Sequence, residues 1–299
     1  MIDLKIVIGS RGSKLALAQS EYVKAKLLEN DPSLDITIKI ISTIGDRVLD
    51  KPLNQIGDKG LFTKEIEAQL LSGEIDIAVH SLKDLPAEVD EAFVLAPTVV
   101  AADAFDCIIL KEGYSSLDDL PKGAVIATGS PRRKAQLLAY RPDFEVVGIR
   151  GNVETRIRKF RELNYDGIVL AKAGLDRLNL SFEISQVFDC NVMIPACGQG
   201  VLALEMVKDS EVLALIEKFA DKKATQRLLL ERAYLKATEG TCHLPIGAYA
   251  DIQEHVTFYA LYGNEKGDIV KKCVQLTDEN QVEQVQQIAK QMMEEMHHG

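Results

Sequence analysis

Arginine is concentrated in one stretch of an otherwise acidic chain. The 299 residues carry 35 Lys and Arg against 45 Asp and Glu, yet eight of the twelve arginines fall within residues 132–177. A guanidinium group presents a planar fork of donors that matches a carboxylate or a phosphate in bidentate fashion. Arginines on neighbouring loop ends therefore predict a pocket for a small polyanion. The eight are Arg132, Arg133, Arg141, Arg150, Arg156, Arg158, Arg161 and Arg177.

The residues around these arginines divide them into two groups. Several sit beside Gly, Ser or Asn, as in Gly129-Ser130-Pro131-Arg132-Arg133 and Arg150-Gly151-Asn152, which suits turns at strand ends and helix starts. Others fit a solvated helix face. The first group, with ligand-binding potential, is Arg132, Arg133, Arg150 and Arg156, and the second is Arg141, Arg158 and Arg161.

Two of the polar loops follow predicted strands and open predicted helices. Gly9-Ser10-Arg11-Gly12-Ser13 follows an apolar strand at residues 4–8, and Thr128-Gly129-Ser130-Pro131-Arg132-Arg133 follows one at 124–128. In α/β proteins ligands bind at the carboxyl ends of strands, where helix N-termini favour anions. The sequence has neither GxGxxG nor a Walker lysine motif at these loops, so carboxylates fit at least as well as nucleotide phosphates.

A candidate acid–base pair follows a third apolar run. Val79-His80-Ser81-Leu82-Lys83-Asp84-Leu85-Pro86 places Ser81, Lys83 and Asp84 at the carboxyl end of a strand over residues 75–79. An aspartate beside a cationic pocket can stabilise a developing cation or shuttle a proton near it. A surface Lys–Asp pair without a catalytic role is the alternative. His80 is interpreted as a packed residue, not a ligand.

The five cysteines fit neither zinc-site spacing nor a disulfide framework, so reduced thiols and no metal site are expected. Cys107 and Cys273 lie in strand-like runs and are interpreted as inert. Cys242 lies in Glu239-Gly240-Thr241-Cys242-His243, a loop punctuated by Gly and, two residues later, Pro. A thiol in such a loop is more accessible and is a candidate reactive centre.

Strand-like and helix-like runs alternate through most of the chain, which predicts open, largely parallel sheets. One α/β series starts at the N-terminus and a similar one near Ala104, although no internal repeat is clear in the sequence. After Asp221 a helix, three strand-like runs and a last polar helix over 278–295 predict a small α+β domain.

Charge and hydropathy exclude several classes of protein. The net charge of -10, the absence of Trp and the lack of aromatic residues among the arginines disfavour nucleic acid as a partner. The chain has no apolar run of membrane-spanning length, and residues 1–9 do not form a secretory signal. The expected compartment is the cytoplasm.

Taken together, five motifs resemble the porphobilinogen deaminase (hydroxymethylbilane synthase) family. Their order and spacing match over the whole chain, which makes the resemblance specific even though each motif alone is weak. The motifs are residues 9–19 (GSRGSKLALAQ), 60–65 (GLFTKE), 80–86 (HSLKDLP), 150–156 (RGNVETR) and 195–200 (PACGQG).

The resemblance implies a transferase of tetrapyrrole biosynthesis. Such an enzyme condenses four porphobilinogen molecules with loss of ammonia and releases linear hydroxymethylbilane. Its dipyrromethane cofactor would be held by a thioether to Cys242, and Asp84 would act in acid–base and electrostatic catalysis. Each pyrrole carries an acetate and a propionate, so a growing chain is a polyanion that arginines can hold in register, at roughly 1.5–3 kcal/mol per charge-assisted hydrogen bond.

Carried over position by position, the resemblance assigns further site residues and a fold. It implies two α/β domains like the halves of a periplasmic binding protein, 1–99 with 200–218 and 105–194, and a third, α+β domain at 222–299 that carries the cofactor cysteine. It also implies a monomer. Cofactor-binding candidates are Cys242, Ser81, Lys83, Asp84, Thr128, Ser130, Arg132 and Arg133. Substrate-binding candidates are Arg11, Ser13, Arg150, Arg156, Arg177, Lys59 and Gln199.

Two other classes of protein stay open. A non-enzymatic anion-binding protein of two-lobed architecture explains the arginines but requires neither Cys242 nor Asp84. A different cysteine-nucleophile transferase would use Cys242 transiently, with His243 as a base. Only a deaminase predicts a permanently bound pyrrole chromophore. Thr241, His243 and Pro131 depart from the usual family pattern, as does the lack of an arginine in 102–106, without removing a candidate residue.

Overall fold

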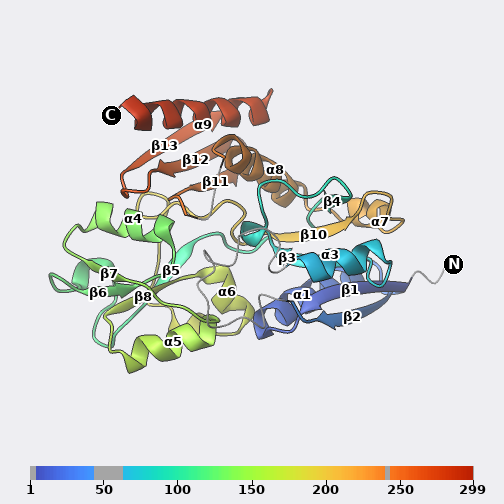
Figure 1. Cartoon of the computed structure of the whole chain (residues 1–299), viewed down its shortest axis with the longest axis horizontal. Coiled ribbons are helices and arrows are strands. Elements are labelled where there is room, and N and C mark those ends of the chain that lie inside the picture. Colours follow the sequence, from blue (N-terminus) through green and yellow to red (C-terminus); the bar gives the residue numbers. More distant parts are fainter. Residues whose placement is uncertain (1–4, 44–62, 240–242, 299) are drawn as a thin grey trace. The chain divides into compact units, whose positions relative to one another are not determined.

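The computed structural model describes residues 5–43, 63–239 and 243–298 (Figure 1). The chain divides into two compact units, Met1–Ala101 with Val201–Thr225 and Ala102–Gly200 with Gln226–Gly299. The first unit is thus built from two segments separated by about a hundred residues. The predicted three-domain boundaries stay a prediction.

The described part of the first unit contains a five-stranded mixed sheet with the order β2-β1-β3-β10-β4. β1 lies parallel to β2 and β3, whereas β10 is antiparallel to β3 and β4. The sequence did not indicate β10 as a strand, although its apolar run is buried along almost its whole length. The elements are β1 (Lys5–Arg11), α1 (Lys14–Asn30), β2 (Asp35–Ile41), α3 (Lys64–Leu71), β3 (Ile77–Ser81), a 3-10 turn (Leu82–Asp84), β4 (Phe93–Ala96), β10 (Leu202–Val207) and α7 (Leu213–Lys218).

Apolar spacing explains how this unit packs. Ile6 and Ile8 alternate along β1 toward one face, and Val23 and Leu27, four residues apart on α1, meet them in the same buried cluster. α1 begins after Ser13, whose hydroxyl accepts a hydrogen bond from the amide of Ala16 at 3.3 Å. The helix start is therefore fixed at the carboxyl end of β1, as the sequence predicted.

The second unit contains a sheet of the same topology, β7-β6-β8-β5-β9 within the described residues. β6 lies parallel to β7 and β8, and β5 is antiparallel to β8 and β9. The predicted strand at 124–128 is confirmed as β6 to within one residue at each end. The elements are β5 (Asp106–Leu110), a 3-10 turn (Leu117–Asp119), β6 (Val125–Ala127), α4 (Pro131–Tyr140), β7 (Glu145–Val147), α5 (Val153–Glu162), β8 (Gly167–Ala171), α6 (Lys172–Arg177), a 3-10 turn (Ser181–Glu183) and β9 (Gln186–Val187).

A smaller antiparallel sheet, β11-β12-β13, forms the rest of the second unit with helices α8 and α9. Figure 1 shows α9 running along this sheet, and Val285, Ala289 and Met292 of that helix pack in one core with Tyr234 and Phe258. The predicted fold class, two α/β portions and a small α+β portion, is confirmed. The elements are α8 (Lys222–Ala237), β11 (Gly247–Ile252), β12 (Val256–Gly263), β13 (Ile269–Leu276) and α9 (Gln281–His298).

The described residues contain neither a helix that could span a membrane nor a cluster that could hold a metal ion. No helix among residues 5–43, 63–239 and 243–298 combines the length and apolar character needed to cross a bilayer. In the same ranges no three His, Cys, Asp or Glu side chains gather in a way that would hold a metal ion.

Candidate functional site

The start of α4 is built to receive an anion. The Ser130 hydroxyl caps the helix by accepting from the Arg133 amide at 3.4 Å, and Pro131 occupies the first turn, where its missing N–H costs nothing. The Thr128 hydroxyl accepts from the Ser130 amide at 3.2 Å. A Cβ on Gly129 would lie 2.9 Å from the Ile149 carbonyl oxygen, so a glycine allows this close approach. The loop thus places hydroxyls and amides at a positive helix end.

Arg132 and Arg133 share one buried carboxylate. Arg132 Nη1 lies 2.7 Å from Asp106 Oδ2, while Arg133 Nε and Nη2 lie 2.9 and 2.7 Å from Asp106 Oδ1. The side chains of Asp106, Arg132 and Arg133 are buried, with residue exposures of 0, 4 and 6%. The sequence correctly separated these arginines from the solvated ones, but it did not indicate that their guanidinium groups bind a carboxylate of the protein itself.

Electrostatics keep this carboxylate ionised. Burial by itself would raise the pKa of Asp106, but the attraction of Arg132 and Arg133 and their hydrogen bonds outweigh it and hold that pKa well below its usual range. Sequence reasoning missed Asp106 as a functional residue. The available signal was an acidic residue at the start of an otherwise apolar strand, because a charge in such a place needs a partner.

A third donor joins the cluster from residues 195–200. Gln199 Nε2 lies 2.9 Å from Asp106 Oδ1 and 2.6 Å from the Ala104 carbonyl oxygen, and the residue is 1% exposed. Arg227 of α8 donates to the Gln199 carbonyl oxygen. The predicted substrate-binding candidate Gln199 is therefore buried among polar groups beside Asp106.

A second buried ion pair, Arg227–Glu231, connects the elements that flank the candidate cofactor loop in the chain. Glu231 of α8 accepts from Arg227 Nε at 2.7 Å and from the Ala250 amide of β11 at 3.2 Å. It also accepts from the Gly198 amide at 2.5 Å. Since residues 240–242 lie between α8 and β11 in the chain, Glu231 fixes both flanking elements to the 195–200 segment.

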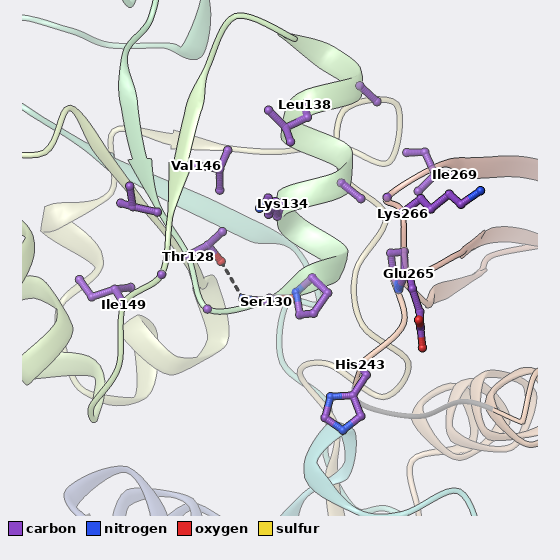
Figure 2. A pocket seen from close by; sticks show the side chains of 18 of the residues that line it. Thr128, Ser130, Lys134, Leu138, Val146, Ile149, His243, Glu265, Lys266 and Ile269 are labelled. Carbon is purple, nitrogen blue, oxygen red and sulfur yellow. Dashed lines mark hydrogen bonds between the residues drawn. The ribbon is translucent and has the colours of Figure 1, made fainter. Parts of the chain in front are cut away.

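A cavity of about 1480 Å³ opens beside the start of α4 in the second unit. Figure 2 shows Thr128 and Ser130 at the helix start, His243 below them, and Glu265 and Lys266 on the turn between β12 and β13. Leu138, Val146 and Ile149 give the cavity an apolar wall, while Lys134, Arg150, Lys159 and Lys266 contribute cations. The lining suits a ligand with apolar rings and several carboxylates.

The other predicted arginines of this unit occupy different places. Arg150 is exposed and lines the cavity, Arg156 is half-buried on α5, and Arg177 donates from Nη2 to the Gly200 carbonyl oxygen at 2.8 Å. The predicted solvated group is confirmed for Arg158 and Arg161, which pair with Glu162 and Glu183 on the surface.

The candidate residues of the first unit gather at the carboxyl ends of β1 and β3. Asp84 is exposed at the end of a 3-10 turn that buried Leu82 and Leu85 hold in place. Lys83 is half-buried on the same turn, and the Ser81 hydroxyl accepts from Gln19 Nε2 at 2.8 Å. Because β1 and β3 are parallel neighbours, Arg11 and Ser13 at the end of β1 share an edge of the sheet with these residues.

His80 takes the structural role that the sequence predicted. It is buried, and its Nε2 lies 3.1 Å from Glu205 Oε2 on β10. The pair joins β3 and β10, neighbouring strands of the first sheet.

Cys242 and Lys59 lie outside the described residues, so their predicted roles stay predictions. Among the described cysteines, burial raises the pKa of Cys107 and of Cys190 to about 12 and also raises the pKa of Cys197 well above its usual value. Thiols that resist ionisation are poor nucleophiles, so the burial of Cys107 agrees with the prediction that it is inert.

The comparisons with known proteins agree with this geometry. The family model "Porphobilinogen deaminase, dipyromethane cofactor binding domain" matches residues 6–214, and the model "Porphobilinogen deaminase, C-terminal domain" matches residues 225–297. The chain belongs to the porphobilinogen deaminase family. The predicted family, the prediction of an enzyme of tetrapyrrole biosynthesis and the predicted dipyrromethane cofactor are confirmed at this level.

Curated family members align over most of their length. The porphobilinogen deaminase of Clostridioides difficile (strain 630) is 48% identical over 266 residues, 88% of each chain. That of Halalkalibacterium halodurans is 43% identical over 306 residues, covering 99% of this chain and 98% of the relative. Among solved structures, the methionine-binding protein MetQ covers 75% of this chain and 93% of its own at 12% identity and a TM-score of 0.46, too distant a likeness to carry an argument.

The donor set of the second unit fits a dipyrromethane. Such a group combines two pyrrole rings with carboxylate side chains, and the cavity combines an apolar wall with hydroxyls, helix amides and cations. His243, the residue after Cys242 in the sequence, lines the same cavity.

Proposed function

We propose that this chain condenses four porphobilinogen molecules into linear hydroxymethylbilane with release of ammonia, and that Cys242 holds the dipyrromethane cofactor by a thioether. When bound, the cofactor supplies the pyrrole on which the chain is built and stays behind at release. The observation that carries the proposal is the capped start of α4, whose Thr128 and Ser130 line a cavity together with His243, with Arg132 and Arg133 buried on the same helix.

The second unit is proposed to hold the cofactor carboxylates. The Thr128 and Ser130 hydroxyls at the start of α4 are placed to donate to an anion, and two buried arginines of the same helix supply positive charge. Ser81 and Lys83 of the first unit, together with Asp84, complete the proposed cofactor set. Arg150, which lines the cavity, would bind the carboxylates of incoming substrate.

Asp84 is proposed to carry the proton transfers. Its carboxylate is exposed, yet its backbone is fixed by two buried leucines, so it can accept and return a proton without rearrangement of the turn. The same carboxylate can stabilise positive charge that develops on a pyrrole as ammonia leaves. Arg11, Ser13, Arg156, Arg177 and Lys59 remain proposed substrate contacts. For Gln199 we assign a supporting role, because it is buried against Asp106.

A monomer in the cytoplasm, without a nucleic-acid partner, is the proposed setting of this activity. The net charge of -10 supports the last point, because a polyanion repels an acidic protein outside a local basic site. Successive additions to a lengthening chain also lead us to propose that the domains move during elongation. A distance probe between domains that stayed constant through every elongation intermediate would contradict this.

Intact-protein mass spectrometry tests the proposal directly. Purified protein is expected to exceed the mass of its 299 residues by two condensed pyrrole units, and peptide mapping is expected to place the excess on Cys242. The Cys242→Ala variant is the matched control and should show no excess.

An unmodified mass calls for incubation with porphobilinogen before it is interpreted. If no adduct then forms on the wild-type chain, the deaminase proposal fails. A non-enzymatic anion-binding protein or a transferase that uses Cys242 transiently would then be the alternatives, and only a bound pyrrole reacts with a pyrrole-specific colour reagent.

A further inference from the structure

Asp106 accepts hydrogen bonds from three side chains that come from two separate parts of the second unit. Arg132 and Arg133 reach it from α4, and Gln199 reaches it from the 195–200 segment, through four hydrogen bonds of 2.7–2.9 Å. The residue itself lies at the first position of β5 and is fully buried. It can therefore influence a ligand only through the side chains that it holds.

Each arginine is fixed at a second point as well. Arg132 Nη1 donates to the Ile194 carbonyl oxygen at 2.7 Å, and Arg133 Nη1 donates to the Val169 carbonyl oxygen at 3.0 Å. A guanidinium group held by a carboxylate on one side and a backbone oxygen on another has a single orientation. All three nitrogens of Arg133 donate within the protein, whereas only Nη1 of Arg132 does so in these bonds, and the N–H groups left over therefore face fixed directions.

The charges in this buried cluster do not cancel. Arginine stays protonated in proteins, so Arg132 and Arg133 contribute two positive charges against the single negative charge of Asp106. The cluster keeps one net positive charge at exposures of 6% or less, next to the positive end of α4. A buried excess charge is costly unless an opposite charge compensates it, which is what a carboxylate of a bound ligand would supply.

We propose that Asp106 is a positioning residue for the cofactor site: it orients Arg132 and Arg133 together and neutralises only one of their two charges, which prepares the start of α4 for one ligand carboxylate. This inference rests on the proposed function, since the ligand is taken to be the dipyrromethane or the porphobilinogen from which it is assembled. It assigns a role to a residue that touches neither.

The Asp106→Asn substitution separates three possible roles because each predicts a different change in ligand binding. The amide keeps the shape of the side chain but removes its charge. A purely electrostatic role predicts that the extra positive charge tightens the binding of an anion. A positioning role predicts weaker binding, because the forks lose their common anchor. A purely structural role predicts a lower melting temperature with unchanged binding by the folded fraction.

The measurement is cofactor loading of the apo protein. Apo wild type and apo Asp106→Asn are incubated with a series of porphobilinogen concentrations, and the mass increase on Cys242 is followed with time. We expect the half-saturating porphobilinogen concentration to rise about tenfold, the equivalent of losing one charge-assisted hydrogen bond, with a smaller change in the rate at saturation. Unchanged or tighter loading by folded Asp106→Asn would overturn the proposal.

Asp143→Asn is the matched control. Asp143 also binds an arginine through two hydrogen bonds, from Arg141 Nε at 2.8 Å and Nη2 at 2.7 Å, but at the other end of α4 and at 23% side-chain exposure. Its loading curve should superimpose on that of the wild type. A tenfold rise in this variant too would mean that any disturbance of α4 weakens loading, and the special role of Asp106 would be lost.

A double variant covers the case in which Asp106→Asn does not fold. Asp106→Asn combined with Arg133→Gln keeps the net charge of the cluster at one, so no additional unpaired charge is buried. It should fold and load poorly, whereas wild-type loading would refute the positioning role. If the wild-type chain itself fails to load, the proposed function fails instead, so the two failures are distinguishable.

Discussion

The two five-stranded sheets share strand order and strand directions but differ at the end where ligands bind. In the first unit Leu202 of β10 lies opposite Ser81, at the carboxyl end of β3. In the second unit the corresponding position on β5 is Asp106, opposite Ala171 at the carboxyl end of β8. Leu202 and Asp106 are both fully buried. The same position in the same strand arrangement therefore holds an apolar side chain in one unit and a carboxylate in the other.

This difference shows how one fold supports two kinds of chemistry. The carboxylate allows the second unit to bury Arg132 and Arg133 in fixed orientations, which suits the binding of an anion. In the first unit, which has Leu202 at this position, Asp84 is exposed and Lys83 is half-buried on the turn after β3. A surface carboxylate suits proton transfer. The comparison predicts that loss of Asp84 in the first unit acts mainly on turnover, and that loss of Asp106 in the second unit acts mainly on cofactor loading.

The largest effect is expected from Asp84→Ala. Loss of a general acid–base carboxylate lowers turnover by roughly 10²–10⁴-fold, while the melting temperature stays close to wild type because Asp84 is exposed. Steady-state product formation and intact mass on the same sample provide the measurement. Asp90→Ala, at another exposed aspartate of this unit, is the control. Turnover like that of the wild type in Asp84→Ala would end the catalytic assignment.

Leu202→Asp tests the comparison by placing a carboxylate in the first unit at the position that Asp106 occupies in the second. The described residues of the first unit place no pair of buried arginines at this position, so the new charge is buried without compensation. The free energy of unfolding at pH 7 should fall by about 3–5 kcal/mol, from lost apolar packing and the unpaired charge. Chemical denaturation measures this loss. Leu202→Asn should lose less, and an equal loss would show that packing alone matters.

The pH dependence of stability sharpens the comparison for Asp106. Its pKa is depressed in the folded chain and near 3.9 in an unfolded one. Its ionised form therefore contributes stability that is fully present above about pH 4 and is lost as the pH falls toward the folded pKa. The unfolding free energies of wild type and Asp106→Asn should differ by about 3 kcal/mol at pH 7 and converge below pH 4. A difference that stays constant from pH 7 to pH 2 would contradict ionic pairing.

The smallest effect is expected for Arg158→Ala. Arg158 and Glu162 form an exposed i,i+4 pair on α5, with side-chain exposures of 62 and 54%. Such pairs contribute about 0.3–0.5 kcal/mol, so the melting temperature should hardly change and cofactor loading not at all. A marked loss of loading would place Arg158 in the binding site and remove the distinction between buried and solvated arginines.

Much of this organisation is predictable from local patterns in the sequence. Alternating and continuous apolar runs predicted β1, α1, β6 and α4, because burial of one face imposes a period on the sequence. The Gly and Ser residues at 9–13 and 128–130 located the helix starts, and Pro131 fits the first helical turn. The family motifs then gave the class of enzyme and the cofactor.

Non-local pairing was not predictable. β10 lies between β3 and β4 although more than a hundred residues separate it from either, and the apolar run of residues 202–207 contains no signal of its neighbours. The repeated sheet topology is equally absent from the sequence, because different apolar residues satisfy the same pattern of burial.

The sequence by itself determined the types of side chain and their local geometry: a cluster of arginines after a capped helix start, an acid–base turn after an apolar strand, and a cysteine in a loop. Only the tertiary structure decided which arginines are buried and what they bind. Asp106 meets Arg132 and Arg133 because β5 and α4 are brought together across 26 and 27 residues of chain. The contribution of a buried charge to stability depends on such partners, which the fold brings together and the local sequence does not specify.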